Sequence, residues 1–450
     1  MENQQRADLA PNSIVNWKAR PLIRFLKVLP AALLTLLLMA CGSSNNNTAT
    51  AVKVRLVNAT QSASLTGSMN GTVQFTNQAA GSASGYVSVT PGNYTITVAT
   101  SNGSLVSSTL TIGLGSGQTY TLLAYDRNGA VFTNVFTENQ LAPATGYSTF
   151  SLANLSPDSG PVDLYVVPVG TPSTSLSGLT PTFTFAQSGV TQVGTALVAG
   201  SYELFATATG NPTDIRFNLP SLALANGQIL TVAFTSTPGG ALVNAVLLNQ
   251  AGSVQFAPTT NARVRVMSAL PTSGGSQVGA TVGGIPLTPV FTPVPSAYTL
   301  IPGNTTAYSI TVAGTAVASP PAANFATGGD FTILVYGAAA SPLISIFTDN
   351  NQVPVAGQVK LRLVNGAVNV AGGVTMYVNN IQAASSIAYG TSSAYFGVST
   401  SSISTLQLIS PSAVSSLFPF SLNTAGAGYT VLVFDPNNLA TLSPQVIRDR

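Results

Sequence analysis

The chain has 450 residues, of which 45% are hydrophobic and only 6% are charged, and its formal net charge is +3. The positive excess lies entirely in residues 1–40, which hold five basic and two acidic side chains, whereas residues 41–450 hold ten of each. A neutral body offers no basic surface to nucleic acid, and a chain without histidine excludes Ser-His-Asp hydrolases and histidine-ligated metal sites.

The first predicted element is an export signal. A basic segment precedes an apolar run of 13 residues at 28–40, which is shorter than the about 20 residues that a membrane span needs. The run closes on a short motif that resembles the lipobox of bacterial lipoproteins: Leu38, Met39, Ala40 and Cys41. This resemblance implies a covalent lipid on Cys41, with no other cofactor, and the Gly42 that follows implies transfer to the outer membrane.

The lipid membrane is therefore the predicted partner of the N-terminus. Residues 1–40 are predicted to be a signal peptide, and residues 41–51 a polar, lipid-anchored tether that faces either the periplasm or the cell surface. Two alternatives stay open, namely an ordinary signal peptide that leaves a free cysteine, and an uncleaved anchor helix.

Beyond the tether, four similar strands open four repeated units. Their sequences are VKVRLVN at 52–58, STFSLAN at 148–154, ARVRVMS at 262–268 and VKLRLVN at 359–365. Alternate units are separated by 210 and 211 residues, which indicates that a block of two units was duplicated. The predicted units are 52–148, 149–258, 259–357 and 358–450.

Composition and turn signals predict the fold of each unit. Lysine and glutamate are scarce, serine, threonine, valine and glycine are abundant, and short apolar strands alternate with glycine-rich turns. We therefore predict an all-β fold of tandem antiparallel, immunoglobulin-like β-sandwich units, four in two pairs. Tyr94, Tyr120 and Tyr202 stand at landmark positions of the units and are expected in cores or corners rather than in a sugar-binding platform.

The opening strands carry basic residues at every second position, as in Lys53 and Arg55. Period two places these side chains on one face of the strand and the valines and leucines on the other. The favoured interpretation is that the basic face meets water and discourages edge-to-edge pairing of sheets. The alternative is a stripe that binds an anionic ligand, although Thr149 and Ser151 replace the charges in the second unit.

The segment LSPDSGPVDLYVV at 155–167, together with VKVRLVN, PGNYTITV and GQTYTLLAY, resembles the bacterial family named "domain of unknown function 4397". The resemblance extends over most of residues 52–450, in four units of unequal clarity. It implies exported, often lipid-anchored β-sandwich proteins of the cell surface or envelope.

Asp158 and Asp163 form the best local pair of acids. Two carboxylates about 5–9.5 Å apart could act on a glycan, and aspartates could contribute to a calcium site. The favoured interpretation is structural, in which Asp158 caps a turn and Asp163 blunts a strand edge, so that no metal site is predicted.

The function predicted from these features is that of a non-catalytic, lipid-anchored envelope protein with a structural, adhesive or ligand-binding role. Its ligand would be a glycan or another envelope protein. The alternatives are a carboxylate-dependent glycan-acting enzyme and a passive spacer for another envelope factor.

Overall fold

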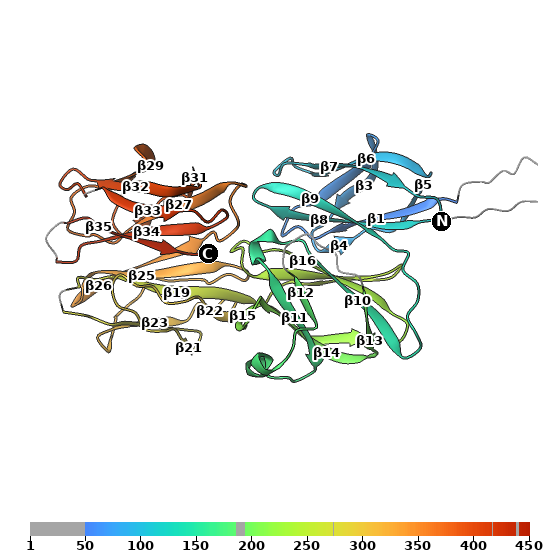
Figure 1. Cartoon of the computed structure of the whole chain (residues 1–450), viewed down its shortest axis with the longest axis horizontal. Helices are drawn as coiled ribbons and strands as arrows, with labels where there is room; N and C mark the ends of the chain where they lie inside the picture. Colours follow the sequence, from blue (N-terminus) through green and yellow to red (C-terminus); the bar gives the residue numbers. More distant parts are fainter. Residues whose placement is uncertain (1–49, 186–193, 273, 416, 438–440) are drawn as a thin grey trace, which may run out of the picture. The chain divides into compact units, whose positions relative to one another are not determined.

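The computed structural model describes residues 50–185, 194–272, 274–415, 417–437 and 441–450 (Figure 1). Thr50–Arg450 is one compact unit. The signal peptide, the lipobox residues and most of the predicted tether lie outside the described residues. Within the described ranges, no helix is long and apolar enough to cross a membrane.

Unit 1 contains two sheets, with the strand orders β4-β1-β8-β9 and β3-β2-β6-β7, and β5 also pairs with β1. Its strands are β1 (Val52–Asn58), β2 (Leu65–Met69), β3 (Thr72–Gln78), β4 (Ser82–Ala83), β5 (Val87–Val89), β6 (Gly92–Thr100), β7 (Ser108–Leu114), β8 (Thr119–Arg127) and β9 (Ala130–Thr137).

Unit 2 contains the sheets β13-β10-β16-β17-β18 and β12-β11-β14-β15. Its elements are β10 (Tyr147–Asn154), the 3-10 helix η1 (Pro157–Ser159), β11 (Val162–Pro168), the 3-10 helix η2 (Ser173–Gly178), β12 (Phe183–Phe185), β13 (Thr195–Val198), β14 (Gly200–Ala208), β15 (Asn211–Leu224), β16 (Ile229–Ser236), β17 (Val243–Asn249) and β18 (Val254–Ala257).

Unit 3 contains the sheets β22-β19-β25-β26 and β21-β20-β23-β24. Its strands are β19 (Asn261–Ala269), β20 (Val278–Val282), β21 (Ile285–Pro286), β22 (Thr299–Pro302), β23 (Tyr308–Val312), β24 (Thr315–Ala316), β25 (Asp330–Ala338) and β26 (Ser341–Asp349).

Unit 4 contains the sheets β30-β27-β34-β35 and β29-β28-β32-β33, and β31 also pairs with β27. Its strands are β27 (Gln358–Asn365), β28 (Val374–Val378), β29 (Ile381–Ile387), β30 (Thr391–Ser392), β31 (Phe396–Ser399), β32 (Ser401–Ile409), β33 (Phe418–Leu422), β34 (Gly428–Phe434) and β35 (Ser443–Arg448).

The predicted fold class is confirmed, because eight sheets form four paired sandwich units. One feature was not predicted from the sequence. The opening strand of every unit pairs in parallel with the landmark strand that follows a glycine turn, as β1 with β8, β10 with β16, β19 with β25 and β27 with β34. The opening strand is thereby placed inside its sheet, with partners on both sides.

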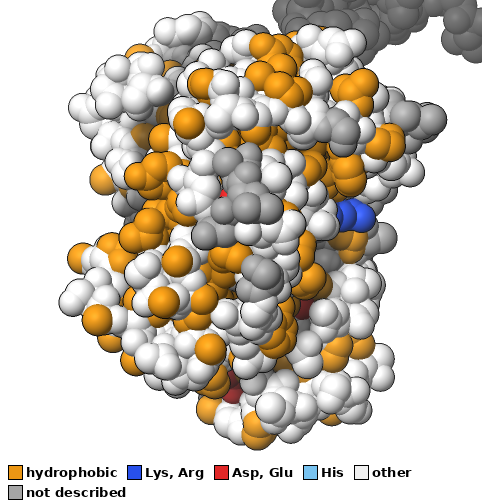
Figure 2. All heavy atoms as spheres, turned by 90° about the vertical axis from the view of Figure 1, so that its left-hand side faces the viewer, with side chains coloured by type: hydrophobic (Ala, Val, Ile, Leu, Met, Phe, Trp, Pro, Cys, Tyr) orange, Lys and Arg blue, Asp and Glu red, His pale blue; other side chains and the backbone are white. Residues whose placement is uncertain are grey.

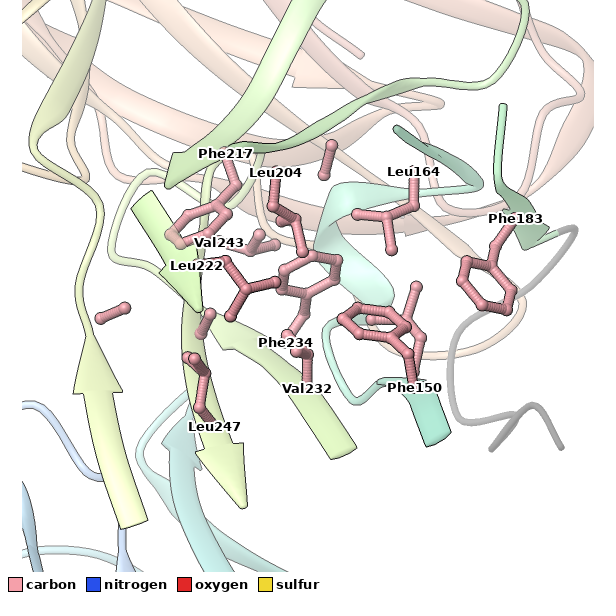
Figure 3. Close-up of a cluster of buried hydrophobic side chains, with 14 of the residues drawn as sticks. Phe150, Leu164, Phe183, Leu204, Phe217, Leu222, Val232, Phe234, Val243 and Leu247 are labelled. Carbon is pink, nitrogen blue, oxygen red and sulfur yellow. The ribbon is translucent and has the colours of Figure 1, made fainter. Parts of the chain in front are cut away.

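Each sandwich has its own apolar core between its two sheets. The core of unit 2 is rich in aromatic side chains, and Figure 3 shows Phe150 of β10 and Phe234 of β16 among the leucines and valines of both sheets. Side chains alternate along each strand between this core and the opposite face of the sheet, as period two requires.

Two further apolar clusters lie between sandwiches rather than within them. One joins units 1 and 2 through Val57, Leu123, Ala153, Leu155, Ala233, Val246 and Leu248. The other joins units 3 and 4 through Met267, Ala269, Leu334, Tyr336, Val364, Leu432, Phe434 and Ile447. The duplicated block of two units is therefore a pair of sandwiches packed face to face on the sheets that hold the opening strands.

The tyrosines at the landmark positions have the predicted core and corner roles. The Tyr94 hydroxyl donates to the Thr90 carbonyl at 2.9 Å, and the Tyr202 hydroxyl donates to the Val198 carbonyl at 2.8 Å. Tyr120 is buried, and its hydroxyl accepts from the Gly115 amide at 3.0 Å. Identical contacts four residues back in units 1 and 2 confirm the register of these repeats.

Replacing Tyr202 with phenylalanine is expected to lower the free energy of unfolding by about 0.5–1.5 kcal/mol, because one hydrogen bond to a carbonyl is lost. Tyr94→Phe removes the equivalent bond in unit 1 and is expected to have the same effect. Urea unfolding followed by circular dichroism measures both losses. Unequal losses would show that the two positions are not equivalent.

Candidate functional site

The basic residues of the opening strands are mostly buried, which corrects the sequence-based interpretation. Arg55, Arg265 and Arg362 are only 3%, 2% and 1% exposed, and of the residues expected to meet water Lys53 alone is exposed. Arg263 and Lys360 are buried too. These strands do not form sheet edges, and their polar face is covered by the neighbouring sandwich, so the prediction that the charges face water and discourage edge pairing is wrong.

Each of the three most buried arginines belongs to the same arrangement of side chains. The arginine Nε donates to a threonine on the parallel neighbour strand, in the pairs Arg55–Thr121 (2.7 Å), Arg265–Thr332 (2.9 Å) and Arg362–Thr430 (3.0 Å). The threonine hydroxyl donates in turn to an acid of the same unit, in the pairs Thr121–Glu138, Thr332–Asp349 and Thr430–Asp449. We refer to these sets as arginine–threonine–acid triads.

In units 3 and 4 the triads exchange ion pairs across the interface. Arg265 of unit 3 donates to Asp449 of unit 4 at 2.7 Å, while Arg362 of unit 4 donates to Asp349 of unit 3. Burial by itself lowers the pKa of Arg265, but the carboxylates of Asp449 and Asp349 reverse this and raise it overall. Reciprocal pairing of desolvated charges fixes the register of the two sandwiches.

A tyrosine ring covers each triad arginine. The guanidinium carbons of Arg55, Arg265 and Arg362 lie 4.9, 4.7 and 5.2 Å from ring centroids. The rings belong to Tyr86, Tyr298 and Tyr395. Contact of a desolvated cation with an aromatic face adds attraction in places where water cannot reach.

The interface of units 1 and 2 uses only one triad. Arg55 pairs with Glu138 at 3.0 Å and also donates to the carbonyls of Asn249 and Gly252 in unit 2. Unit 2 has Ser151 in place of an arginine, and its buried hydroxyl has no hydrogen-bond partner. At this interface, therefore, only unit 1 contributes a triad arginine.

The triad arginines all bind threonines and acids of the protein, so they do not form a stripe that is open to an anionic ligand.

Asp158 joins the two pairs of sandwiches. It lies in η1, is 1% exposed and accepts two hydrogen bonds from Arg127 of unit 1, both at 2.7 Å. The Ser236 hydroxyl and the Val353 amide also donate to its carboxylate, at 2.8 and 2.7 Å. The predicted turn-capping role is wrong, because these bonds reach residues far away in the sequence.

Asp163 lies in β11, between β12 and β14, so its predicted role at a strand edge is also wrong. It is buried; its Oδ2 accepts from the Gly210 amide at 2.9 Å, and its Oδ1 is buried without a partner. The two predicted acids thus have separate partners. In the part of the chain that the structure describes, no three His, Cys, Asp or Glu side chains gather to hold a metal ion.

A cavity of about 660 Å³ opens where units 2 and 3 meet the end of unit 4. Its lining holds five arginines against three aspartates: Arg216, Arg263, Arg265, Arg448 and Arg450, with Asp158, Asp214 and Asp449. Two further acids lie behind the lining, since Arg263 pairs with Asp330 and Arg265 lies 4.0 Å from Asp349. Figure 2 shows a face of the molecule on which hydrophobic and uncharged side chains prevail.

Three of the lining arginines have structural partners. Arg263 binds Asp330 through two bonds of 2.8 and 2.6 Å, and Arg265 belongs to a triad. Arg450 donates to the carbonyls of Asn351 at 2.9 Å and Pro157 at 3.1 Å. These arginines hold the walls of the cavity in place.

Arg216 is less completely paired. Its Nη2 donates to Asp214 at 2.6 Å, while its Nε is buried without an acceptor. Burial, followed by repulsion from Arg263, lowers the pKa of Arg216 to about 10. Arg448 is exposed, lines the same cavity and donates through its Nε to a main-chain oxygen of Arg450.

Sequence reasoning did not identify the threonines and acids of the triads, or the tyrosines whose rings cover the triad arginines. A signal for the threonines was present, because each follows an aromatic residue in the landmark strand, 66, 67 or 68 residues after its arginine. Arg216 and Asp214 offered no comparable repeat. Cys41, Leu38, Met39 and Ala40 lie outside the described residues.

Comparison with known proteins gives one family match. Residues 36–165 match the family described as Domain of unknown function (DUF4397), which covers unit 1 and the start of unit 2. No curated protein matches the chain.

Two solved structures show distant similarity. A candidate cell adhesion protein from Bacteroides uniformis has 10% identity and a TM-score of 0.23, over 47% of this chain and 100% of the other. The TIE protein of Bacillus anthracis has 10% identity and a TM-score of 0.14, over 83% and 69%. Similarity at this level carries no functional argument.

Proposed function

We propose that the chain is a non-catalytic, lipid-anchored protein of the bacterial cell envelope whose four sandwiches form a rigid adhesive or ligand-binding array. The observation that carries this proposal is the use made of the scarce charged residues. Triads, ion pairs and hydrogen bonds to neutral oxygens engage seven of the ten basic side chains beyond the N-terminal segment, namely Arg55, Arg127, Arg263, Arg265, Arg362, Lys360 and Arg450.

Rigidity suits a protein that presents a surface at a distance from a membrane. Ion pairs that cross from one sandwich to the next oppose hinge motion, since separation of the units would leave desolvated charges without partners. Four domains joined by flexible linkers would need none of these contacts. The paired sandwiches thus favour an array with a fixed geometry.

The candidate catalytic acids do not favour the enzyme alternative. Asp158 is balanced by Arg127 and accepts from the Val353 amide, so its carboxylate serves the junction of the units. Asp163 accepts from a backbone amide. A general acid or nucleophile has to reach substrate in a cleft. Asp158 lines the cavity between units 2 and 3, but both of its carboxylate oxygens are occupied by protein donors, and Asp163 is buried outside that lining.

Metabolic labelling with palmitate tests the anchor. The wild-type chain, expressed in a Gram-negative host, is expected to incorporate label and to fractionate with the outer membrane. Cys41→Ala is expected to lose the label completely, because the sulfur that carries the lipid is gone.

Gly42→Asp is the matched control for this experiment. It leaves the cysteine in place, so the label is expected to remain while the protein shifts to the inner membrane. Equal labelling of Cys41→Ala and the wild type would refute lipidation at this site.

A further inference from the structure

We propose that the cavity between units 2 and 3 binds a carboxylate-bearing oligosaccharide, with Arg216 and Arg448 as the cations that receive the carboxylate. This inference rests on the proposed function for the source of the ligand, an acidic glycan of the cell envelope. Binding itself does not depend on lipidation of the chain.

The position of Arg216 in its strand is the first argument. β15 is the edge strand of its sheet, and its register against β14 shifts at this point. Ala206 pairs with Phe217 and Thr207 pairs with Ile215, so that Arg216 is the extra residue of a bulge. Bulges redirect a side chain away from the regular pattern of the strand and are frequent beside binding sites. Here the redirected side chain lines the cavity.

The incomplete pairing of the Arg216 guanidinium is the second argument. The half-buried guanidinium of Arg216 binds one carboxylate oxygen at 2.6 Å, and its buried Nε has no acceptor, so its hydrogen bonding is incomplete. Arginine is suited to carboxylates because its planar group offers donors that match the two oxygens. A ligand carboxylate in the cavity would supply the acceptor that the Arg216 Nε lacks.

The size and remaining lining of the cavity favour a saccharide over a small inorganic anion. A volume of about 660 Å³ falls within the roughly 300–1,000 Å³ typical of sites for organic ligands. Asn211 and Thr213 offer polar groups, while Leu300 and the ring of Tyr298 offer apolar surface. Sugars need both, since they present hydroxyls around their rims and C–H groups on their faces.

Calorimetric titration of the detergent-solubilised full chain with trigalacturonic acid tests the proposal. Saturable binding is expected, with no binding of the neutral trisaccharide maltotriose. Arg216→Gln is expected to weaken the affinity about 10- to 100-fold, as does loss of a charge-assisted hydrogen bond elsewhere. Arg448→Gln, a substitution at an exposed position that leaves the core intact, is expected to weaken it in the same direction.

Two further variants separate a binding role from a structural one. Lys53→Gln removes an exposed charge outside the cavity and is expected to bind like wild type. Asp214→Asn removes the carboxylate that competes for Arg216 and is expected to bind more tightly than wild type. If the Arg216–Asp214 ion pair were only structural, Asp214→Asn would not bind the ligand more tightly than wild type.

Several results would overturn the proposal. These are absence of saturable binding to wild type, or an unchanged affinity in both Arg216→Gln and Arg448→Gln. Equal binding of an acidic hexapeptide or of sulfate would overturn the saccharide assignment. The Cys41→Ala chain is expected to bind trigalacturonic acid normally, so a failure of the anchor and a failure of this site can be told apart.

Discussion

Replacing Arg362 with alanine is expected to lower the free energy of unfolding by about 3–5 kcal/mol. Arg362 is 1% exposed, donates to Thr430 at 3.0 Å and pairs with Asp349 across the interface of units 3 and 4. Alanine leaves the buried carboxylate of Asp349 with Arg265 as its remaining cation, at 4.0 Å. Desolvated charges without adequate partners are among the few causes of so large a loss. Urea unfolding followed by circular dichroism gives the value.

Removing both members of the ion pair provides the sharper test. The double variant Arg362→Met, Asp349→Leu removes this ion pair and leaves Arg265 paired with Asp449. It is expected to recover most of the lost stability, because apolar side chains of similar size often replace buried ion pairs without loss. Lys53→Ala is the control for loss of an exposed charge, with an expected change within about 0.5 kcal/mol. A loss of less than about 1 kcal/mol in Arg362→Ala would contradict the structural role of the triad.

The repeated units were predictable because their signals are local. The opening strands, the landmark strands and the glycine turns recur within short windows, and the separations of 210 and 211 residues show the duplication directly. The corner tyrosines followed from the same alignment, since Tyr94 and Tyr202 contact carbonyls only four residues away. Periodicity and turn chemistry are properties that a single sequence carries.

The role of the basic residues was not predictable in the same way. Period two correctly places Arg55 and Val54 on opposite faces of a strand, but it cannot tell which face a second sandwich covers. In the structure both faces are covered. The partner of Arg265 is Asp449, 184 residues away, in a unit that no local pattern links to it. Charged side chains are usually exposed, so the sequence alone favoured an exposed strand. It does not reveal that a second sandwich covers these side chains.

The candidate binding site combines residues that the sequence keeps far apart. Arg216 belongs to unit 2, Tyr298 to unit 3 and Arg448 to unit 4. The register shift that redirects Arg216 arises from the pairing of β14 with β15 and has no glycine or proline signal at Arg216 itself. A site at the junction of repeats depends on how the repeats pack against one another. Alignment of the repeat sequences gives no information about this packing.

Replacing Asp158 with alanine is expected to weaken the connection between the two pairs of sandwiches as well as to lower stability by about 3–5 kcal/mol. Its carboxylate accepts hydrogen bonds from Arg127 of unit 1, Ser236 of unit 2 and the Val353 amide at the end of unit 3. The variant leaves a cation and a backbone amide without their acceptor. Unfolding is expected to change from one transition to two, because each pair keeps its own interface cluster.

Asp163→Ala is the matched control, since Asp163 is also a buried aspartate of unit 2 but accepts from the Gly210 amide within the same unit. It is expected to destabilise unit 2 without separating the two pairs. Limited proteolysis detects the difference, because the segment around Val353 loses its bond to Asp158 only in Asp158→Ala and is then open to cleavage. If both variants were cleaved there equally, the junction would not depend on Asp158. A protease-sensitive connection with intact halves would establish that the pair of sandwiches is the folding unit of this chain, and that Asp158 makes two such units behave as one.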